Sequence, residues 1–175
     1  MKGKRKTGSK NVTLGLLIMY LVVMTWIILF KMELDIRLLR QMNLRSINLI
    51  PFAGSLIVNG KADMSEVILN IAVFIPFGTY LSMLDRKMSF IMKVLPVFAV
   101  SLMYEVLQYC FAIGASDITD LLGNTLGGII GIGIFAVCSK ILGEKTVRIL
   151  NILAAVGTAA VVVLLVLLIV VNSVC

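Results

Sequence analysis

The sequence predicts an all-α membrane protein, a bundle of about five transmembrane helices with the N-terminus in the cytoplasm. Of the 175 residues, 60% are hydrophobic and only 14% are charged, whereas soluble domains carry about 25% charged residues. The apolar residues form continuous runs of about 20, the length that crosses a hydrocarbon core about 30 Å thick. These runs lack the alternation of a closed β-barrel, the other structure that satisfies its backbone in lipid.

Five apolar stretches are long enough to span the membrane. We expect helices at residues 12–30, 66–84, 90–113, 121–142 and 148–171, the last of them almost wholly aliphatic. The first stretch follows a basic segment, as in a secretory signal. However, its apolar run is too long, and no small-residue cleavage site follows it. It is therefore predicted to be an uncleaved anchor.

The spans divide the chain into one membrane domain with short flanking segments. Residues 1–11 are a basic tail, and residues 12–142 hold four spans and one long loop at 31–65. Residues 143–175 add a turn and the last span. Lys and Arg concentrate in the tail and in the turns near residues 86–93 and 140–148. Because basic residues favour the cytoplasmic side, we place these segments inside and the long loop outside.

The long loop allows two local interpretations. Residues 33–45 mix charged and apolar side chains and suit either a short hairpin or a helix in the membrane interface. Further along the loop, Asn59-Gly60 predicts a turn.

Residue usage excludes several functions. Histidine is absent, which excludes a His-ligated metal, a Ser-His-Asp triad and a phosphohistidine intermediate. The cysteines, Cys110, Cys138 and Cys175, form no C-x-x-C pair and suit small apolar positions. The net charge of +7 lies in runs beside the spans, where it contacts lipid headgroups. We expect the lipid bilayer as a partner, no nucleic acid, and neither a metal nor another cofactor.

Polar residues inside the third span are the first functional candidates. A charged side chain near the bilayer centre costs about 2.5–3.5 kcal/mol, so such residues face the bundle interior or a wet cavity. Glu105 and Gln108 share one helix face, and Glu105 lies roughly 12 Å below the outer end. Alternatively, Glu105 is neutral or paired and only ties helices together, with Arg45 or Lys61 as its partner.

The fourth span begins with further polar residues. Asp117 or Asp120 caps this helix, because carboxylates favour the positive end of a helix, and the second aspartate needs another role. Asn124 follows Asp120 by four residues, so the two side chains share a face. In the second span Asn70 lies near the outer end, and Pro76 further along predicts a kink.

These polar residues fall at one depth in the predicted topology. They come from three spans, lie in the outer half of the membrane, and have Asn48 of the long loop nearby. We therefore predict one outward-facing, net acidic pocket formed by Asn70, Glu105, Gln108, Asp117, Asp120 and Asn124. Glycines at every fourth residue of the fourth span, Gly123, Gly127 and Gly131, predict close helix packing, either within the chain or between copies.

The ordered motifs resemble the VanZ-like family of bacterial membrane proteins. They are Asn48-Leu-Ile-Pro-Phe52, Asn70 to Gly78, Glu105-x-x-Gln108, and Asp117-Ile-x-Asp120 followed by Asn124-Thr-Leu-Gly-Gly128. The match runs over residues 13–142. Many members carry an Arg before the aspartates, where this chain has Ala115 and Ser116. The resemblance implies a bacterial plasma membrane location. It also implies low-level resistance to the glycopeptide teicoplanin without a change in the peptidoglycan target.

Three functions stay open at this point. The residues favour a non-enzymatic protein that modulates the cell envelope by binding a cationic or amphiphilic ligand, or a lipid headgroup, in the acidic pocket. A small drug–proton or lipid transporter would use Glu105 as its coupling residue. A membrane enzyme on a lipid-linked substrate would use Asp117 and Asp120 to hold Mg²⁺ and Glu105 as the base. The sequence leaves the ligand and the oligomeric state open.

Overall fold

The computed structural model describes residues 2–30, 46–52, 57–58, 61–62, 64–112 and 116–174. Long helices dominate these residues: α1 (Lys2–Phe30), α3 (Ser65–Leu84), α4 (Phe90–Phe111), α5 (Ile118–Leu142) and α6 (Thr146–Val174), with the 3-10 turn η1 (Gly143–Lys145) before α6. The all-α membrane fold is confirmed. Helix α1 begins earlier than expected and runs through the basic tail, because Lys and Arg are good helix formers. The two interpretations of residues 33–45 lie outside the described residues.

Four helical stretches in the described residues are long and apolar enough to cross a membrane. They are Ser9–Leu29, Ser65–Leu84, Phe90–Phe111 and Ile118–Leu164. The last stretch contains α5, η1 and much of α6, so the expected count of five crossings stays a prediction. Large apolar side chains are exposed along these helices, Ile91 and Leu153 among them, as expected where the surrounding solvent is lipid.

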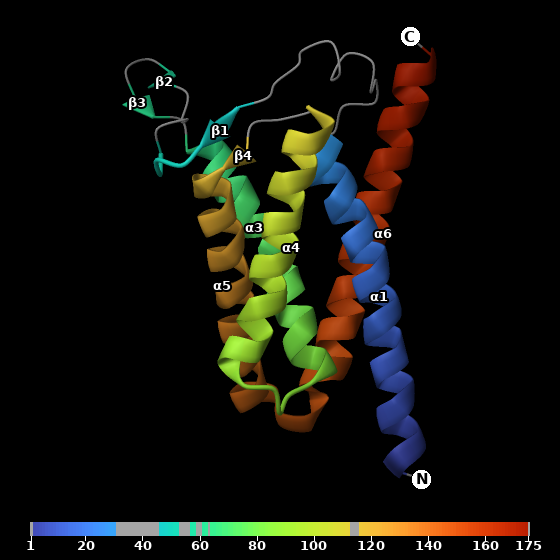
Figure 1. Ribbon diagram of the computed structural model, residues 1–175. Helices are drawn as coiled ribbons and strands as arrows, with labels where there is room; N and C mark the ends of the chain where they lie inside the picture. The colour runs from blue at the N-terminus through green and yellow to red at the C-terminus, as the bar shows by residue number, and fades with distance from the viewer. Residues whose placement is uncertain are drawn as a thin grey trace.

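The helices run antiparallel in a bundle with two distinct ends (Figure 1). The N-terminus of α1, the turn between α3 and α4, and η1 lie at one end. The short strands β1 (Ile47–Asn48) and β4 (Ser116–Asp117) lie at the other end, beside the start of α3 and α5. They pair in parallel, with Ile47 opposite Ser116 and Asn48 opposite Asp117. This pairing ties the loop before α3 to the turn that enters α5.

A second pair of strands lies on either side of the Asn59-Gly60 pair. β2 (Ile57–Val58) and β3 (Lys61–Ala62) are antiparallel, with Val58 opposite Lys61. The Asn59-Gly60 pair itself lies outside the described residues.

Helices α3 and α5 approach closely through glycines. A Cβ at Gly127 would overlap the carbonyl of Ile71, and one at Gly131 would overlap that of Ile75. The carbonyl of Gly131 also accepts a 3.1 Å hydrogen bond from the Thr79 hydroxyl. At Gly123 a Cβ would meet its neighbours at ordinary contact distance, 3.7 Å. The glycine face is therefore tightest in the middle of α5.

The glycine pattern of the sequence missed one further contact. A Cβ at Gly78 of α3 would overlap the backbone of Gly128, and one at Gly128 would overlap the side chain of Val97 in α4. Gly78 and Gly128 therefore let α3, α4 and α5 meet.

Polar contacts dock α1 against the other helices. The Tyr20 hydroxyl donates to the carbonyl of Val73, in the turn of α3 that precedes Pro76. Near the opposite end, the Thr13 hydroxyl donates to Asn151 Oδ1 of α6 at 3.0 Å. Thr13 is fully buried and Asn151 nearly so. The last helix therefore packs on the first through a buried polar pair.

Candidate functional site

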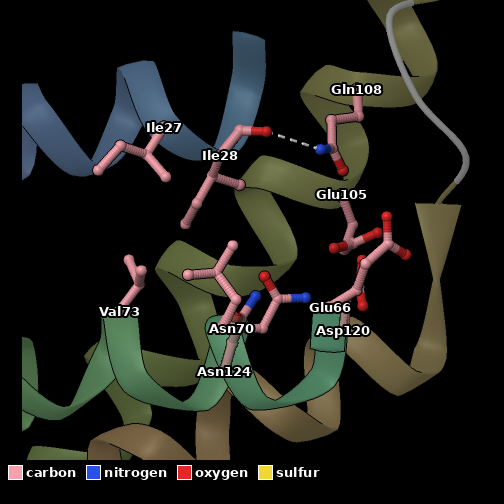
Figure 2. A pocket seen from close by; sticks show the side chains of 10 residues that line it. Ile27, Ile28, Glu66, Asn70, Val73, Glu105, Gln108, Asp120 and Asn124 are labelled. Carbon is pink, nitrogen blue, oxygen red and sulfur yellow. Dashed lines mark hydrogen bonds between the residues drawn. The ribbon is translucent and has the colours of Figure 1, made fainter. Parts of the chain in front are cut away.

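The bundle encloses a polar cavity of about 330 Å³ near the end that carries β1 and β4. Four helices contribute to its wall. The polar lining residues are Glu66, Asn70, Glu105, Gln108, Asp120 and Asn124, and the apolar ones are Ile27, Ile28, Leu69 and Val73. We call this space the acidic cavity. In Figure 2 its acidic side chains gather at one side of the view, and Ile27 and Val73 lie at the other.

Glu105 is the most buried carboxylate of the acidic cavity, with 3% of its surface exposed. Its Oε2 atom accepts a hydrogen bond of 2.8 Å from the backbone N–H of Asp117. The Asp120 carboxylate lies close enough to act on it electrostatically. The sequence suggested Arg45 or Lys61 as a partner for Glu105. The side chains of both residues lie outside the described part of the chain.

Asp117 supports the acidic cavity without lining it. It is the N-cap of α5, and its Oδ1 atom accepts a 2.7 Å hydrogen bond from the backbone N–H of Thr119. Its Oδ2 atom accepts a 3.0 Å bond from Asn48 Nδ2. The structure therefore assigns the cap of α5 to Asp117, and Asp120 lines the acidic cavity.

Two buried amides of the cavity wall have oxygen atoms without a hydrogen-bond partner. Gln108 Nε2 donates to the carbonyl of Ile28 at 3.0 Å, and Asn124 Nδ2 donates to Ser101 Oγ at 3.0 Å. Gln108 and Asn124 are 4% and 1% exposed, and neither Gln108 Oε1 nor Asn124 Oδ1 has a hydrogen-bond partner. Buried polar atoms normally do have one. The wall of the cavity therefore holds two amide oxygens that lack a donor.

Helix α3 supplies the remaining polar groups. Asn70 lines the acidic cavity as a half-buried side chain, and Glu66 lies one helical turn before it. Sequence reasoning missed Glu66, because an acidic residue in the first turn of a helix is explained by the helix dipole alone. Its spacing of four residues from Asn70 was the available signal.

The lining has a clear electrostatic character. It holds the carboxylates of Glu66, Glu105 and Asp120, and among the described residues that line it there is no Lys or Arg. No group of three Asp, Glu or Cys side chains in the described chain gathers closely enough to hold a metal ion. That the site takes no metal or cofactor stays a prediction. Chemically, the arrangement offers hydrogen-bond acceptors and negative charge to a donor-rich cation.

The sequence matches the model of a known protein family. The model of the family described as VanZ/LLP1 matches residues 17–139, which include every polar residue of the acidic cavity. The chain belongs to the VanZ/LLP1 family. It is therefore a multi-pass membrane protein, and the resemblance seen in the motifs is confirmed. All of α6 lies beyond the part that the VanZ/LLP1 model matches.

A curated relative supports the same assignment. Over 137 residues the chain is 36% identical to Protein VanZ of Enterococcus faecium, in an alignment that covers 78% of this chain and 81% of that protein. No solved structure matches the chain.

Proposed function

We propose that this VanZ/LLP1 protein modulates the susceptibility of the bacterial cell envelope to glycopeptide antibiotics such as teicoplanin. In this proposal it lies in the plasma membrane, and its acidic cavity opens outward and holds a cationic group of the ligand. The protein acts by binding and catalyses no reaction. Its similarity to Protein VanZ motivates the choice of antibiotic class.

One observation carries the choice of a cationic ligand: two buried amide oxygens in the lining have no donor. The NH₂ groups of Gln108 and Asn124 each donate one hydrogen bond, while their oxygens accept none. An ammonium group has three donors and no acceptor. It can therefore satisfy these oxygens and balance carboxylate charge together. An anion in the same place would face Glu105 and Asp120 without a described cation in the lining.

The outward direction rests on the distribution of charge between the two ends of the bundle. Arg86, Lys87 and Lys145 lie in turns at the end that also holds the N-terminus (Figure 1). Basic residues favour the cytoplasmic side. The acidic cavity lies at the opposite end, next to β4, where a ligand from outside the cell reaches it.

The test is antibiotic susceptibility in a sensitive host at matched levels of membrane protein. Cells carry no protein, wild type, Glu105→Gln or Asp120→Asn, and teicoplanin and vancomycin are compared. We expect wild type to protect against teicoplanin and both variants to lose that protection. Each substitution removes a negative charge and leaves the size of the side chain almost unchanged. Tyr109→Phe, an exposed change on the same helix as Glu105, should protect like wild type.

Two results would count against the proposal. If no expression level of wild type protects, the glycopeptide role fails for this protein. If Glu105→Gln and Asp120→Asn both protect fully, the acidic cavity is not the site of action.

Proton-coupled transport is the second candidate, and the buried carboxylate of Glu105 within α4 favours it. A transporter would lose protection when the proton gradient is collapsed with an uncoupler. Protection by binding alone would persist at the same protein level, and this outcome is the one we expect.

A further inference from the structure

An apolar groove adjoins the acidic cavity. It has a volume of about 550 Å³ and lies among residues 20–27 of α1, 72–83 of α3 and 150–161 of α6, with Ile134 of α5. We call it the apolar groove. No element of the described chain fills it, and its position between α1, α3 and α6 leaves it to the lipid phase.

The few polar groups of the apolar groove are already engaged. The Tyr20 hydroxyl donates to the carbonyl of Val73. The Thr79 hydroxyl donates to the carbonyls of Ile75 and Gly131, and the Tyr80 and Thr158 side chains lie close to each other. The groove therefore offers a hydrocarbon surface and no demand for a polar ligand.

The two spaces are adjacent. Ile27 and Val73 line both of them. Along α3, residues within 66–73 line the acidic cavity and residues within 72–83 line the apolar groove. The second of these ranges is about 16 Å long at 1.5 Å per residue. The surface beside α3 therefore changes from acidic to apolar along this one helix, from the end near β4 toward the middle of the membrane.

An acidic cavity beside an apolar groove matches the charge and shape of an amphiphile. A head at the acidic cavity would meet the carboxylates of Glu105 and Asp120 and the unpartnered oxygens of Gln108 and Asn124. Such a head must be cationic and rich in donors. Phospholipids carry a phosphate beside any amine, and that phosphate would lie against the same carboxylates.

We propose that one amphiphile with a primary amine head and a single alkyl chain occupies both spaces, the amine in the acidic cavity and the chain in the apolar groove. The inference rests on the proposed function and names its ligand class. The occupant comes to the protein as an amine without a phosphate, and is not a phospholipid of the surrounding bilayer. The acidic cavity and the apolar groove then hold two parts of the same ligand. An amine without an alkyl chain therefore binds more weakly than the same amine with one.

Photocrosslinking of the full chain in phosphatidylcholine nanodiscs tests the proposal. The probe is dodecylamine with a diazirine in the middle of its chain, and mass spectrometry maps the labelled residues. We expect labels within residues 72–83 and 150–161. A tenfold excess of plain dodecylamine should suppress them at least fivefold. Dodecanol, butylamine and lysophosphatidylethanolamine should suppress them less than twofold.

A matched pair of variants tests whether the alkyl chain of the ligand lies in the apolar groove. Gly157 lines the apolar groove, and a Cβ there meets nothing within 4 Å, so Gly157→Leu occupies the groove without disturbing the fold. Gly133 has the same open surroundings on α5 and does not line the groove. We expect Gly157→Leu and Glu105→Gln each to lower labelling at least fivefold, and Gly133→Leu to leave it unchanged.

The outcomes separate this inference from the proposed function. If Glu105→Gln lowers labelling while Gly157→Leu does not, the alkyl chain of the ligand lies outside the apolar groove. This result overturns the inference, but the acidic cavity still binds amines. Suppression by lysophosphatidylethanolamine as strong as that by dodecylamine would assign the site to a phospholipid and overturn the inference. Labels spread over the exposed face of α4, insensitive to every competitor, would show partition into lipid only and overturn it as well.

Discussion

The backbone N–H of Asp117 donates a 2.8 Å hydrogen bond to Glu105 Oε2. The same Asp117 caps α5 with one side-chain oxygen and accepts from Asn48 with the other. The residue at the start of α5 therefore fixes the position of the buried carboxylate in α4. It also joins the long loop, through β1 and β4, to the wall of the acidic cavity.

Removing the Asp117 side chain should destabilise the protein while a capping amide should restore most of the loss. Asp117→Ala loses the acceptor for the N–H of Thr119, and losing an N-cap costs about 1 kcal/mol. Asp117→Asn keeps an oxygen that accepts this bond. Thermal unfolding in detergent should give a clearly lower midpoint for the alanine variant. Equal midpoints for the two variants would contradict the capping role.

A methyl group on the tight part of the glycine face should separate α3 from α5. Gly127→Ala places a Cβ against the carbonyl of Ile71, whereas a Cβ at Gly133 meets nothing within 4 Å. Overpacking costs about 1–3 kcal/mol, while alanine in an open helix position gains up to about 1 kcal/mol over glycine. Unfolding midpoints should therefore fall for Gly127→Ala and hold or rise for Gly133→Ala. The reverse order is incompatible with the described packing.

The hydroxyl of Tyr20 should contribute to stability in a way that an exposed tyrosine does not. Tyr20 donates to the carbonyl of Val73, and a hydrogen bond between helices in a membrane is worth about 0.6–2 kcal/mol. Tyr20→Phe removes this donor, and Tyr109→Phe makes the same change at an exposed position of α4. We expect a lower unfolding midpoint for Tyr20→Phe only. A similar effect of both changes would argue against the contact.

Sidedness should follow the charge distribution. In a background with Cys110, Cys138 and Cys175 changed to Ala, Ile50→Cys lies in the exposed segment after β1, and Lys87→Cys lies in the exposed turn before α4. A membrane-impermeant maleimide should label Ile50→Cys in intact cells and Lys87→Cys only after permeabilisation. The opposite pattern would place the acidic cavity on the cytoplasmic side.

The sequence predicted the helices well because lipid imposes a simple rule. A span must be a continuous apolar run, and the expected runs at 66–84 and 121–142 agree closely with α3 and α5. Helix α1 extends on its N-terminal side beyond the expected span at 12–30, because hydropathy marks the apolar part of a helix and not its solvated extension. How the helices dock was not predictable, because contacts such as Thr13 with Asn151 join residues far apart in the chain.

The cavity was predictable where polar residues stand out against an apolar span. Glu105, Gln108 and Asn124 line it for that reason. Glu66 was not predicted because it lies at the end of a span, where charged residues are common. Ile27 and Val73 carry no signal at all in an apolar helix, yet they join the acidic cavity to the apolar groove. Their role depends on how α1 and α3 face each other.

The most direct test of the central claim is maleimide labelling of Asn70→Cys in intact cells, with and without dodecylamine. In the background lacking the native cysteines, this residue reports both the side on which the acidic cavity opens and whether an amine fills it. We expect labelling from outside by an impermeant reagent, slowed at least fivefold by dodecylamine and little by dodecanol. Labelling only after permeabilisation, or labelling from outside that dodecylamine leaves unchanged, would contradict the central claim.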